Sequence, residues 1–346
     1  MFLQVDRRLP APARRRLLDT LRPTEVVDEG GRTRCADGLP TEPGDALVVA
    51  TSGTTGDPKG VVLTHDAVQA SALATSRRLA VTGDDHWLAC LPLAHVGGLS
   101  VVTRALVTGT GLTVLPGFEA AAVDAAAAAG ATLVSLVATA LPRIDATRWR
   151  RIVLGGGRPP AERPPNTVTT YGMTETGSGV VYDGTPLDGV EVRIAADGEV
   201  LLRAPMLLRA YRDGTTPLDA DGWLHTDDAG EIDPDGRLRV HGRRGDVIVT
   251  GGEKVWPDAV EAVLARHPAV AEVAVAGVPD ATWGHRVVAW VVARDASHTP
   301  ALDGLCDHVR AVLPAYMAPR ELRLVTSLPR TALGKVRRDV LATREH

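Results

Sequence analysis

Short apolar runs alternate with longer helical stretches through the first 190 residues, and this alternation limits the fold more than any other feature of the sequence. Strands that take turns with helices along a chain usually assemble into layers of helix on sheet. We therefore predict an α/β fold whose N-terminal part is a large layered domain. The predicted strands are residues 46–50, 87–91, 112–115, 133–137, 152–154 and 168–170, and the predicted helices are residues 65–79, 99–107 and 119–129.

The pattern changes to hairpins at Gly189. Asp197-Gly198 separates the apolar segments 190–194 and 200–203, and Asp235-Gly236 separates two further predicted strands. An Asp-Gly pair between two alternating segments is typical of a tight β-turn. A β-rich subdomain is therefore expected to follow the layered part.

A smaller α+β domain is predicted to begin near Gly242. Pro257 opens a predicted helix that Pro268 closes, because proline is tolerated in the first turn of a helix but not in its interior. The remaining elements are strands at residues 270–276, 287–293 and 321–325 and a helix at residues 302–313. We thus expect an N-terminal domain of residues 1–241 and a mobile C-terminal domain of residues 242–346, joined at a glycine-containing hinge.

The charge balance excludes several kinds of partner. Of 346 residues, 38 are Lys or Arg and 42 are Asp or Glu, so the formal net charge is -4. Broad binding to nucleic acid or to an anionic membrane surface requires a surplus of positive charge, and we therefore expect small-molecule ligands. The uncharged stretch 125–142 is interpreted as a helix that gives way to a buried strand, and not as a membrane span.

The cysteines and the N-terminal residues indicate a reducing compartment. Cys35, Cys90 and Cys306 are odd in number and widely spaced, which suits neither a disulfide framework nor a structural zinc site. The N-terminal segment has no sustained apolar run of signal-peptide length. The expected location is the cytoplasm, and the sequence leaves open whether the chain forms a homo-oligomer.

Positive charge is carried almost entirely by arginine. There are 35 Arg and only three Lys, namely Lys59, Lys254 and Lys335. The lysine ammonium is a compact point charge on a flexible stem, whereas the guanidinium is a planar fork. A lysine retained in such a sequence therefore suggests a position where the point charge has a chemical role.

One glycine- and threonine-rich segment directly follows a predicted strand. It combines hydroxyls, a flexible backbone and one ammonium, which are the groups that cradle phosphate oxygens. It is not a P-loop, because proline precedes the lysine and glycine follows it. The segment reads Thr51-Ser52-Gly53-Thr54-Thr55-Gly56-Asp57-Pro58-Lys59-Gly60.

This segment resembles the phosphate-binding signature of the adenylate-forming superfamily, which includes acyl-CoA synthetases, luciferases and carrier-protein adenylation domains. The superfamily's later motifs follow in the expected order. They correspond here to Tyr171-Gly172-Met173-Thr174-Glu175, to Gly222 through Asp228, to the hinge Gly242-Arg243-Arg244-Gly245-Asp246 and to Pro329 through Lys335. Two positions depart from the usual pattern: Asp227 stands where glycine is common, and Gly245 stands where relatives carry an Asp or Lys pivot.

The resemblance implies ATP, Mg²⁺ and, as a co-substrate, CoA. It assigns catalysis to Lys335, Thr174 and Glu175, with Glu175 also holding the metal. Ribose binding falls to Asp228 and Arg243, and Asp246 either orients that arginine or caps a turn. The other expected nucleotide-binding residues are Thr51, Ser52, Gly53, Thr54, Thr55, Gly56, Lys59, Gly156, Gly157, Tyr171 and Gly172, and Gly251 and Gly252 are expected to line the tunnel for the pantetheine arm of CoA.

The implied reaction is AMP-forming ligation. A carboxylate is a poor electrophile, and attack on the α-phosphorus of ATP converts it into an acyl-adenylate with a good leaving group. Two anions must approach each other, so the cationic groups act by neutralising charge in the transition state. Rotation of the C-terminal domain about the hinge would then admit the thiol of CoA.

Two features point to the acid. The short segment before the phosphate loop resembles compact actinobacterial o-succinylbenzoate-CoA ligases of menaquinone biosynthesis, as do residues 91–99 and 175–184. That acid has a second carboxylate, which calls for polar donors in the pocket, and His95 and Ser178 are the candidates, with Arg158 as a further cation. The alternatives are a ligase for another aryl or short acyl acid, an enzyme that loads a carrier protein, and a non-catalytic nucleotide-binding relative.

Overall fold

The structure is a computed structural model that describes residues 1–52, 58–157, 159–160, 162–295, 297–330 and 336–343. The chain divides into two compact units. Unit 1 comprises residues Met1–Arg193, Leu201–His225 and Ile232–Leu238, and unit 2 comprises Ile194–Val200, Thr226–Glu231 and Arg239–His346. The last change from unit 1 to unit 2, near residue 239, is close to the predicted boundary. Two short segments before it, Ile194–Val200 and Thr226–Glu231, also belong to unit 2. The domain boundary at residue 242 therefore stays a prediction.

A seven-stranded sheet forms the layered part of unit 1, in the order β12-β11-β10-β9-β8-β6-β7. The strands from β10 to β7 pair in parallel, whereas β11 and β12 pair antiparallel. The bounds are β6 His86–Ala89, β7 Gly111–Val114, β8 Leu133–Val137, β9 Arg151–Gly155, β10 Thr167–Gly172, β11 Gly179–Tyr182 and β12 Thr185–Pro186.

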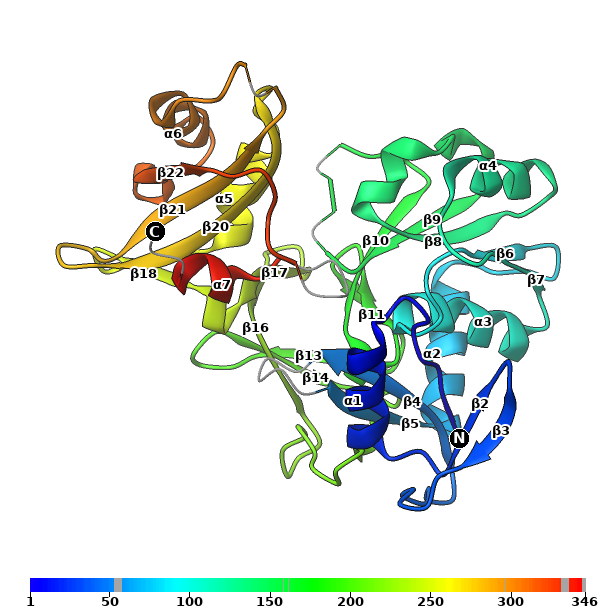
Figure 1. Cartoon of the computed structure of the whole chain (residues 1–346). Helices are drawn as coiled ribbons and strands as arrows, with labels where there is room; N and C mark the ends of the chain where they lie inside the picture. The colour runs from blue at the N-terminus through cyan, green and yellow to red at the C-terminus, as the bar shows by residue number, and fades with distance from the viewer. Residues whose placement is uncertain (53–57, 158, 161, 296, 331–335, 344–346) are drawn as a thin grey trace. The chain divides into compact units, whose positions relative to one another are not determined.

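Helices cover both faces of this sheet (Figure 1). Alternate residues of β6 serve opposite faces, since Leu88 packs in one cluster with Val123 of α4, whereas the Trp87 ring lies 5.4 Å from the Arg104 guanidinium of α3. The helices are α2 His65–Arg78, α3 Val96–Thr108 and α4 Ala120–Ala128, with 3₁₀ turns at Ala138–Arg143 and Ala146–Arg148. The predicted α/β layering is therefore confirmed.

A second sheet of unit 1 has the order β1-β4-β5-β15. Its central hairpin is formed by β4 and β5, and helix α1 packs on it through Leu17 and Leu21. The sequence analysis predicted β4 but neither α1 nor β5. The bounds are β1 Phe2–Leu3, α1 Ala11–Leu21, β4 Asp45–Ser52, β5 Pro58–Thr64 and β15 Ala210–Tyr211, and a separate hairpin pairs β2 Glu25–Asp28 with β3 Gly31–Arg34.

The predicted Asp-Gly hairpins are confirmed in a third sheet, of order β13-β14-β16-β17, whose strands are divided between the two units. The Gly198 N–H donates to Ala195 O at 2.9 Å, and the Gly236 N–H donates to Asp233 O at 2.8 Å, as expected at tight turns. The strands are β13 Glu191–Ile194, β14 Glu199–Arg203, β16 Leu224–Ile232 and β17 Leu238–Arg243.

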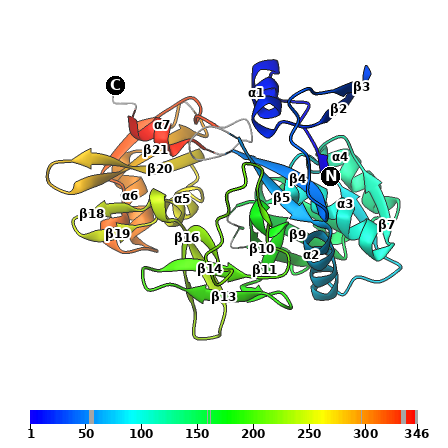
Figure 2. The ribbon, with the colours of Figure 1, turned by 90° about the horizontal axis from the view of Figure 1, so that it is seen from below.

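Unit 2 is built on a five-stranded sheet in which β19, β18, β21 and β20 are neighbours and β22 pairs with β21. Helices α5 and α6 lie on one face of this sheet and α7 on the other, as Figure 2 shows. Residues of α5 and α6 belong to one core cluster, and Leu341 of α7 belongs to a second. The helices are α5 Pro257–Leu264, α6 Leu302–Arg310 and α7 Arg338–Thr343, and the strands are β18 Ile248–Thr250, β19 Glu253–Val255, β20 Val270–Asp280, β21 Gly284–Ala293 and β22 Glu321–Leu324.

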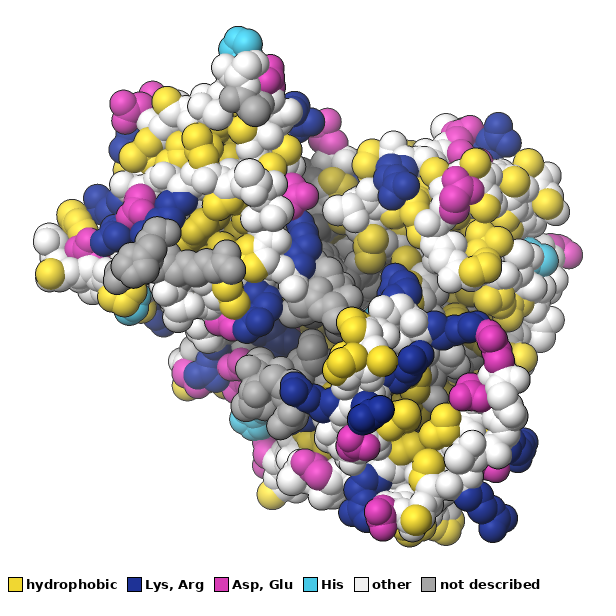
Figure 3. Space-filling model, in the orientation of Figure 1, with side chains coloured by type: hydrophobic (Ala, Val, Ile, Leu, Met, Phe, Trp, Pro, Cys, Tyr) yellow, Lys and Arg dark blue, Asp and Glu magenta, His cyan; other side chains and the backbone are white. Residues whose placement is uncertain are grey.

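The cysteines, the helix lengths and the surface charges also bear on the sequence-based expectations. The three cysteines are free thiols, and burial raises the pKa of the Cys90 thiol to about 11, which makes it unreactive at neutral pH. None of the helices in the described part of the chain has the length and apolar composition that a membrane span requires. Lys and Arg side chains are dispersed among Asp and Glu side chains on the face in Figure 3, in line with the near-balanced net charge.

Buried Asp85 ties the strands of the large sheet together. Its carboxylate accepts Arg150 Nε at 2.7 Å, Arg150 Nη2 at 2.6 Å, the Thr132 hydroxyl at 2.7 Å and the Thr82 N–H at 2.9 Å. Burial alone would raise the pKa of Asp85, but these hydrogen bonds and the Arg150 charge hold it below its ordinary value. The carboxylate is therefore a stabilising anion at neutral pH.

Replacing Asp85 with Asn is expected to lower the free energy of unfolding by about 1.5–3 kcal/mol at pH 7, because half-buried Arg150 loses charge-assisted hydrogen bonds. A carboxyl with a depressed pKa stabilises the fold above its unfolded pKa of about 3.9, and this contribution is lost as pH falls through the folded pKa. The difference between wild type and Asp85→Asn should therefore shrink below about pH 4. Urea denaturation between pH 7 and pH 3 measures it.

The matched control is Asp188→Asn, because the Asp188–Arg77 pair at 3.1 Å is exposed. This change should cost less than about 1 kcal/mol. Equal stability losses in the two variants at pH 7 would contradict the role given to Asp85.

Candidate active site

Glu175 lies in a short 3₁₀ turn, Thr174–Thr176, directly after β10. The Met173 N–H donates to the Thr176 hydroxyl oxygen at 2.9 Å, and that hydroxyl donates to Ser178 O at 2.6 Å. The backbone at Gly172 lies close to the backbone at Ser178. Only glycine permits this approach, because a Cβ at position 172 would lie 2.2 Å from Ser178 O. Local hydrogen bonds thus fix the turn that carries the predicted metal-binding carboxylate.

Glu175 and Lys59 meet at one tyrosine that the sequence analysis missed. The Tyr211 hydroxyl donates to Glu175 Oε1 at 3.0 Å, and Lys59 Nζ lies 4.8 Å from the centre of the Tyr211 ring. The Glu175 carbonyl also accepts the Leu208 N–H at 2.8 Å, so the segment before Tyr211 is bonded to the same turn. Three segments that are distant in sequence therefore converge, although the catalytic roles of Lys59 and Glu175 stay predictions.

The start of the phosphate-binding segment is held by the β4–β5 hairpin. Thr51 is paired with Lys59, and Ser52 with Pro58. Other predicted residues lie outside the described part of the chain, so their placement carries no argument: Gly53, Thr54, Thr55, Gly56, Arg158 and Lys335.

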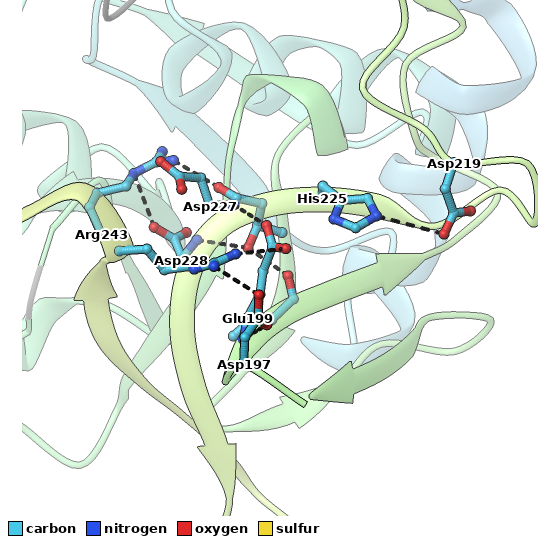
Figure 4. A network of polar contacts seen from close by, with 10 residues as sticks. Asp197, Glu199, Asp219, His225, Asp227, Asp228 and Arg243 are labelled. Atoms are coloured by element: carbon cyan, nitrogen blue, oxygen red, sulfur yellow. Dashed lines mark hydrogen bonds and ion pairs between the residues drawn. The ribbon is translucent and has the colours of Figure 1, made fainter. Parts of the chain in front are cut away.

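Asp228 and Arg243, both predicted to contact ribose, form an ion pair with 3.0 Å between Arg243 Nε and Asp228 Oδ1 (Figure 4). Arg243 Nη1 also donates to Thr226 O at 2.8 Å. Asp227 has a φ of +58°, a left-handed conformation that explains why glycine is common at this position. Its N–H donates to Glu199 Oε1 at 2.8 Å, which helps to hold this conformation.

Asp246 does not orient Arg243, which corrects one of the two sequence-based alternatives. Its carboxylate accepts Arg338 Nη1 at 2.7 Å, and the same guanidinium pairs with Asp258 and Glu261. Burial alone would lower the pKa of Arg338, but these carboxylates raise it above its ordinary value. The guanidinium thus joins the hinge segment to α5 and to the start of α7, three residues after Lys335.

The predicted glycine positions differ in how strongly the backbone requires them. Gly156 has a φ of +79° at the end of β9, whereas Gly157 has open space around it. Gly251 and Gly252 have φ values of +58° and +86° in the turn between β18 and β19.

Gly245 stands at the hinge position where relatives carry an Asp or Lys pivot. It has open space around it and no positive φ, so local packing does not explain why glycine is found there. The nearby Lys254 is exposed on β19.

Ser178 belongs to a buried polar cluster around Arg104 of α3. Arg104 Nη2 donates to Ser178 Oγ at 3.0 Å, and Nη1 lies 3.5 Å from Ser135 Oγ. Ser178 Oγ is also 3.2 Å from Ser71 Oγ. Arg104 is 3% exposed, its Nε has no hydrogen-bond partner, and it forms no ion pair within the described residues.

A narrow cleft adjoins this cluster. Its lining comes from the β4–β5 hairpin, α2, α3 and Gly177, and it includes Ser71 and Ser100. A buried guanidinium without a carboxylate is costly, and two hydroxyls and the Trp87 ring compensate it only in part. The arrangement therefore suits an anionic ligand group. No sequence motif singles out Arg104, because its partners lie more than 30 residues away along the chain.

His95 is the N-cap residue of α3. Its backbone carbonyl accepts the N–H groups of Gly98 and Leu99 at 3.0 and 2.9 Å. The imidazole Nε2 is 3.8 Å from Asp6 Oδ2. A hydrogen bond from Arg8 lowers the pKa of Asp6 below its ordinary value, so Asp6 offers His95 a negative charge at neutral pH. The substrate-binding role predicted for His95 stays a prediction.

The donor set fits a magnesium ion that arrives with nucleotide. Among the described residues, no group of three or more His, Cys, Asp or Glu side chains could hold a metal ion. Mg²⁺ is commonly bound through one or two carboxylates together with substrate phosphates and water. Glu175, whose carboxylate accepts the Tyr211 hydroxyl, would be one such carboxylate, and its metal-binding role stays a prediction.

Comparisons with known proteins agree with this geometry. The family model for AMP-binding enzyme matches residues 10–212, and the model for the AMP-binding enzyme C-terminal domain matches residues 259–335. A probable 2-succinylbenzoate--CoA ligase of Mycobacterium tuberculosis is 41% identical in an alignment that covers 86% of this chain and 84% of the relative.

Solved structures are also similar. The o-succinylbenzoate CoA synthetase of Bacillus subtilis, in complex with the acyl-adenylate intermediate OSB-AMP, has a TM-score of 0.80 and 32% identity, covering 89% of this chain and 72% of its own. The same synthetase in complex with ATP and magnesium ion has a TM-score of 0.78 and 31% identity, with the same coverage of the two chains.

Replacing Gly172 with Ala is expected to disturb the turn that carries Glu175, because the new Cβ would overlap the Ser178 carbonyl. Such overpacking costs about 1–3 kcal/mol of unfolding free energy. We expect a stability loss in this range and a lower rate of ATP-dependent pyrophosphate release. Gly304→Ala is the control, because its Cβ would enter open space within α6 and should stabilise that helix. Unchanged stability and pyrophosphate release in Gly172→Ala would contradict this reading of the turn.

Proposed function

Because the chain belongs to the AMP-binding enzyme family, we propose that it joins o-succinylbenzoate (2-succinylbenzoate) to CoA in an ATP-dependent reaction. The observation that carries the choice of acid is the buried Arg104 guanidinium, which has no acidic partner within the described residues. A dicarboxylate can present one carboxylate for activation and the other to this guanidinium. The names of the similar ligases support the same acid.

In the first step, a carboxylate oxygen of the succinyl group attacks the α-phosphorus of ATP. The bond from that phosphorus to the bridging oxygen breaks, and pyrophosphate leaves. Lys59 would bind phosphate oxygens as a point charge, and Glu175 would hold Mg²⁺, which neutralises phosphate charge when bound. Lys335 would stabilise the negative charge that develops as the two anions meet.

In the second step, the sulfur of CoA attacks the acyl carbon of the adenylate. The thiol proton is lost, the bond from the acyl carbon to the phosphate oxygen breaks, and AMP leaves. The positive-φ turn at Gly251 and Gly252 is the segment that we expect to contact the pantetheine arm. The hinge at Gly242–Asp246 would allow this exchange of roles between steps.

Recognition of the benzoate carboxylate would rest on Arg104 and Ser178. A charge-assisted hydrogen bond is stronger than a neutral one, and its strength rises where water is excluded. The ligand carboxylate would also supply the counter-charge that Arg104 lacks. Bringing it there requires the narrow cleft beside Ser71 to widen as the acid enters.

The test of the proposed function is pyrophosphate release across a panel of acids, followed by detection of the CoA thioester by mass spectrometry. We expect o-succinylbenzoate to give both products and benzoate or short acyl acids to give little. No release with o-succinylbenzoate would overturn the proposal. Release without a CoA thioester would favour the enzyme that loads a carrier protein.

Within this assay, Lys335→Ala should reduce adenylate formation about 10²–10³-fold, as expected for losing one stabilising group in the transition state. Lys335→Arg should not restore the rate, because the guanidinium is larger and planar. Lys254→Arg is the matched control and should retain the wild-type rate. Near-normal adenylation by Lys335→Arg would show that no point charge is needed there.

Arg104→Met is expected to change acid selectivity. Loss of a hydrogen bond between charged groups costs about 2–3 kcal/mol, or roughly 30- to 150-fold in kcat/KM. The loss should appear with o-succinylbenzoate but not with 3-benzoylpropionate, which lacks the second carboxylate. Because both acids are measured on one variant, altered folding cannot produce the change in ratio. An unchanged ratio would remove Arg104 from acid recognition.

A further inference from the structure

We infer that Tyr211 is a positioning residue that holds Glu175 and Lys59 apart and ready for the nucleotide. This inference rests on the proposed function, since it assigns both partners to the handling of Mg²⁺ and ATP. The hydroxyl of Tyr211 donates to Glu175 Oε1, and the face of its ring receives the Lys59 ammonium. One side chain therefore contacts the predicted metal-binding carboxylate and the predicted phosphate-binding cation.

The backbone fixes Tyr211 on both sides. In the pairing of β15 with β5, Tyr211 is opposite Val61, two residues from Lys59. The Arg209 N–H donates to Val62 O at 3.0 Å, and the Arg212 N–H donates to Gly60 O at 2.7 Å. Because these bonds flank the tyrosine, its ring has little freedom to leave the hairpin.

The neighbouring arginines anchor the segment further. Arg209 pairs with Asp45, whose side chain is 1% exposed, through Nε at 2.9 Å. Arg212 donates to the Leu21 and Pro40 carbonyls at 3.2 and 2.9 Å. The position of Tyr211 is thus determined by unit 1 before any ligand binds.

The physical role follows from the opposite charges of Glu175 and Lys59. An ammonium and a carboxylate that met directly would neutralise each other, and each would then be a weaker partner for the nucleotide. The two form no ion pair in the described residues. Tyr211 instead offers each a weaker contact, a neutral hydrogen-bond donor for the carboxylate and a ring face for the cation, and both contacts can be retained when ATP and Mg²⁺ bind.

The hydroxyl and the ring can be tested separately. Tyr211→Phe keeps the ring beside Lys59 but removes the donor to Glu175. Binding of ATP, measured by isothermal titration calorimetry at increasing Mg²⁺ without any acid, should need about 3- to 10-fold more Mg²⁺ for half-saturation, the effect expected for one hydrogen bond. At saturating Mg²⁺, the affinity for ATP should approach that of wild type.

Tyr211→Leu removes both contacts and should also weaken ATP binding at saturating Mg²⁺, by about 3- to 10-fold. Tyr182→Phe is the matched control. Its hydroxyl is bonded to Thr75 Oγ1 at 3.2 Å in the buried interior, away from Glu175 and Lys59. This control should leave the Mg²⁺ requirement unchanged even if it lowers the melting temperature.

Equal Mg²⁺ requirements in wild type and Tyr211→Phe would overturn the inference, as would an equal shift in Tyr182→Phe. Because the assay contains no acid, its result is independent of which acid is activated. A wild-type protein that binds ATP with Mg²⁺ but releases no pyrophosphate with o-succinylbenzoate would overturn the proposed function and leave the inference on Tyr211 standing.

Discussion

The pairing of β4 with β5 is the interaction on which the rest of unit 1 depends. This hairpin carries the two ends of the predicted phosphate-binding segment, and its second strand, β5, also pairs with β15. The Thr64 hydroxyl at its end accepts the Ala67 N–H at 3.1 Å and so caps α2. Because one hairpin supports a sheet, a helix start and the Lys59 ammonium, a shift in its register would displace all three.

The unusual arginine content has a structural explanation. Arg150, Arg209 and Arg338 each make several hydrogen bonds to carboxylates in half-buried networks. Such networks use the planar fork of the guanidinium, which an ammonium cannot reproduce. The structure places Lys59 differently, against the Tyr211 ring face and in no ion pair within the described residues, although its charge acts on the Asp213 carboxylate. Arginine thus stabilises the fold, whereas Lys59 is the residue to which we assign a ligand in the proposed function.

Local patterns allowed most of the layered fold to be predicted, because β-favouring runs such as 133–137 form strands wherever they can be buried. β5 was missed because Pro58 and Gly60 are typical of loops, although here they form a strand held by its partners. Tyr211 and Arg104 were missed for another reason. Their partners in the site lie 36 and 74 residues away, and such contacts are set by tertiary packing that no local motif encodes.

The turn after β10 connects the two halves of the proposed site. Glu175 contacts Tyr211 at one end, and Ser178, only three residues later, accepts a hydrogen bond from Arg104 at the other. The hydroxyl of Thr176 bonds to Ser178 O between them, and Gly172 leaves the room that this closure needs. Because hydrogen bonds join the two ends of this turn, we expect a ligand that displaces Ser178 to displace Glu175 as well. Under the proposed function, recognition of the acid at Ser178 and placement of the predicted metal-binding carboxylate of Glu175 would then be coupled through this turn.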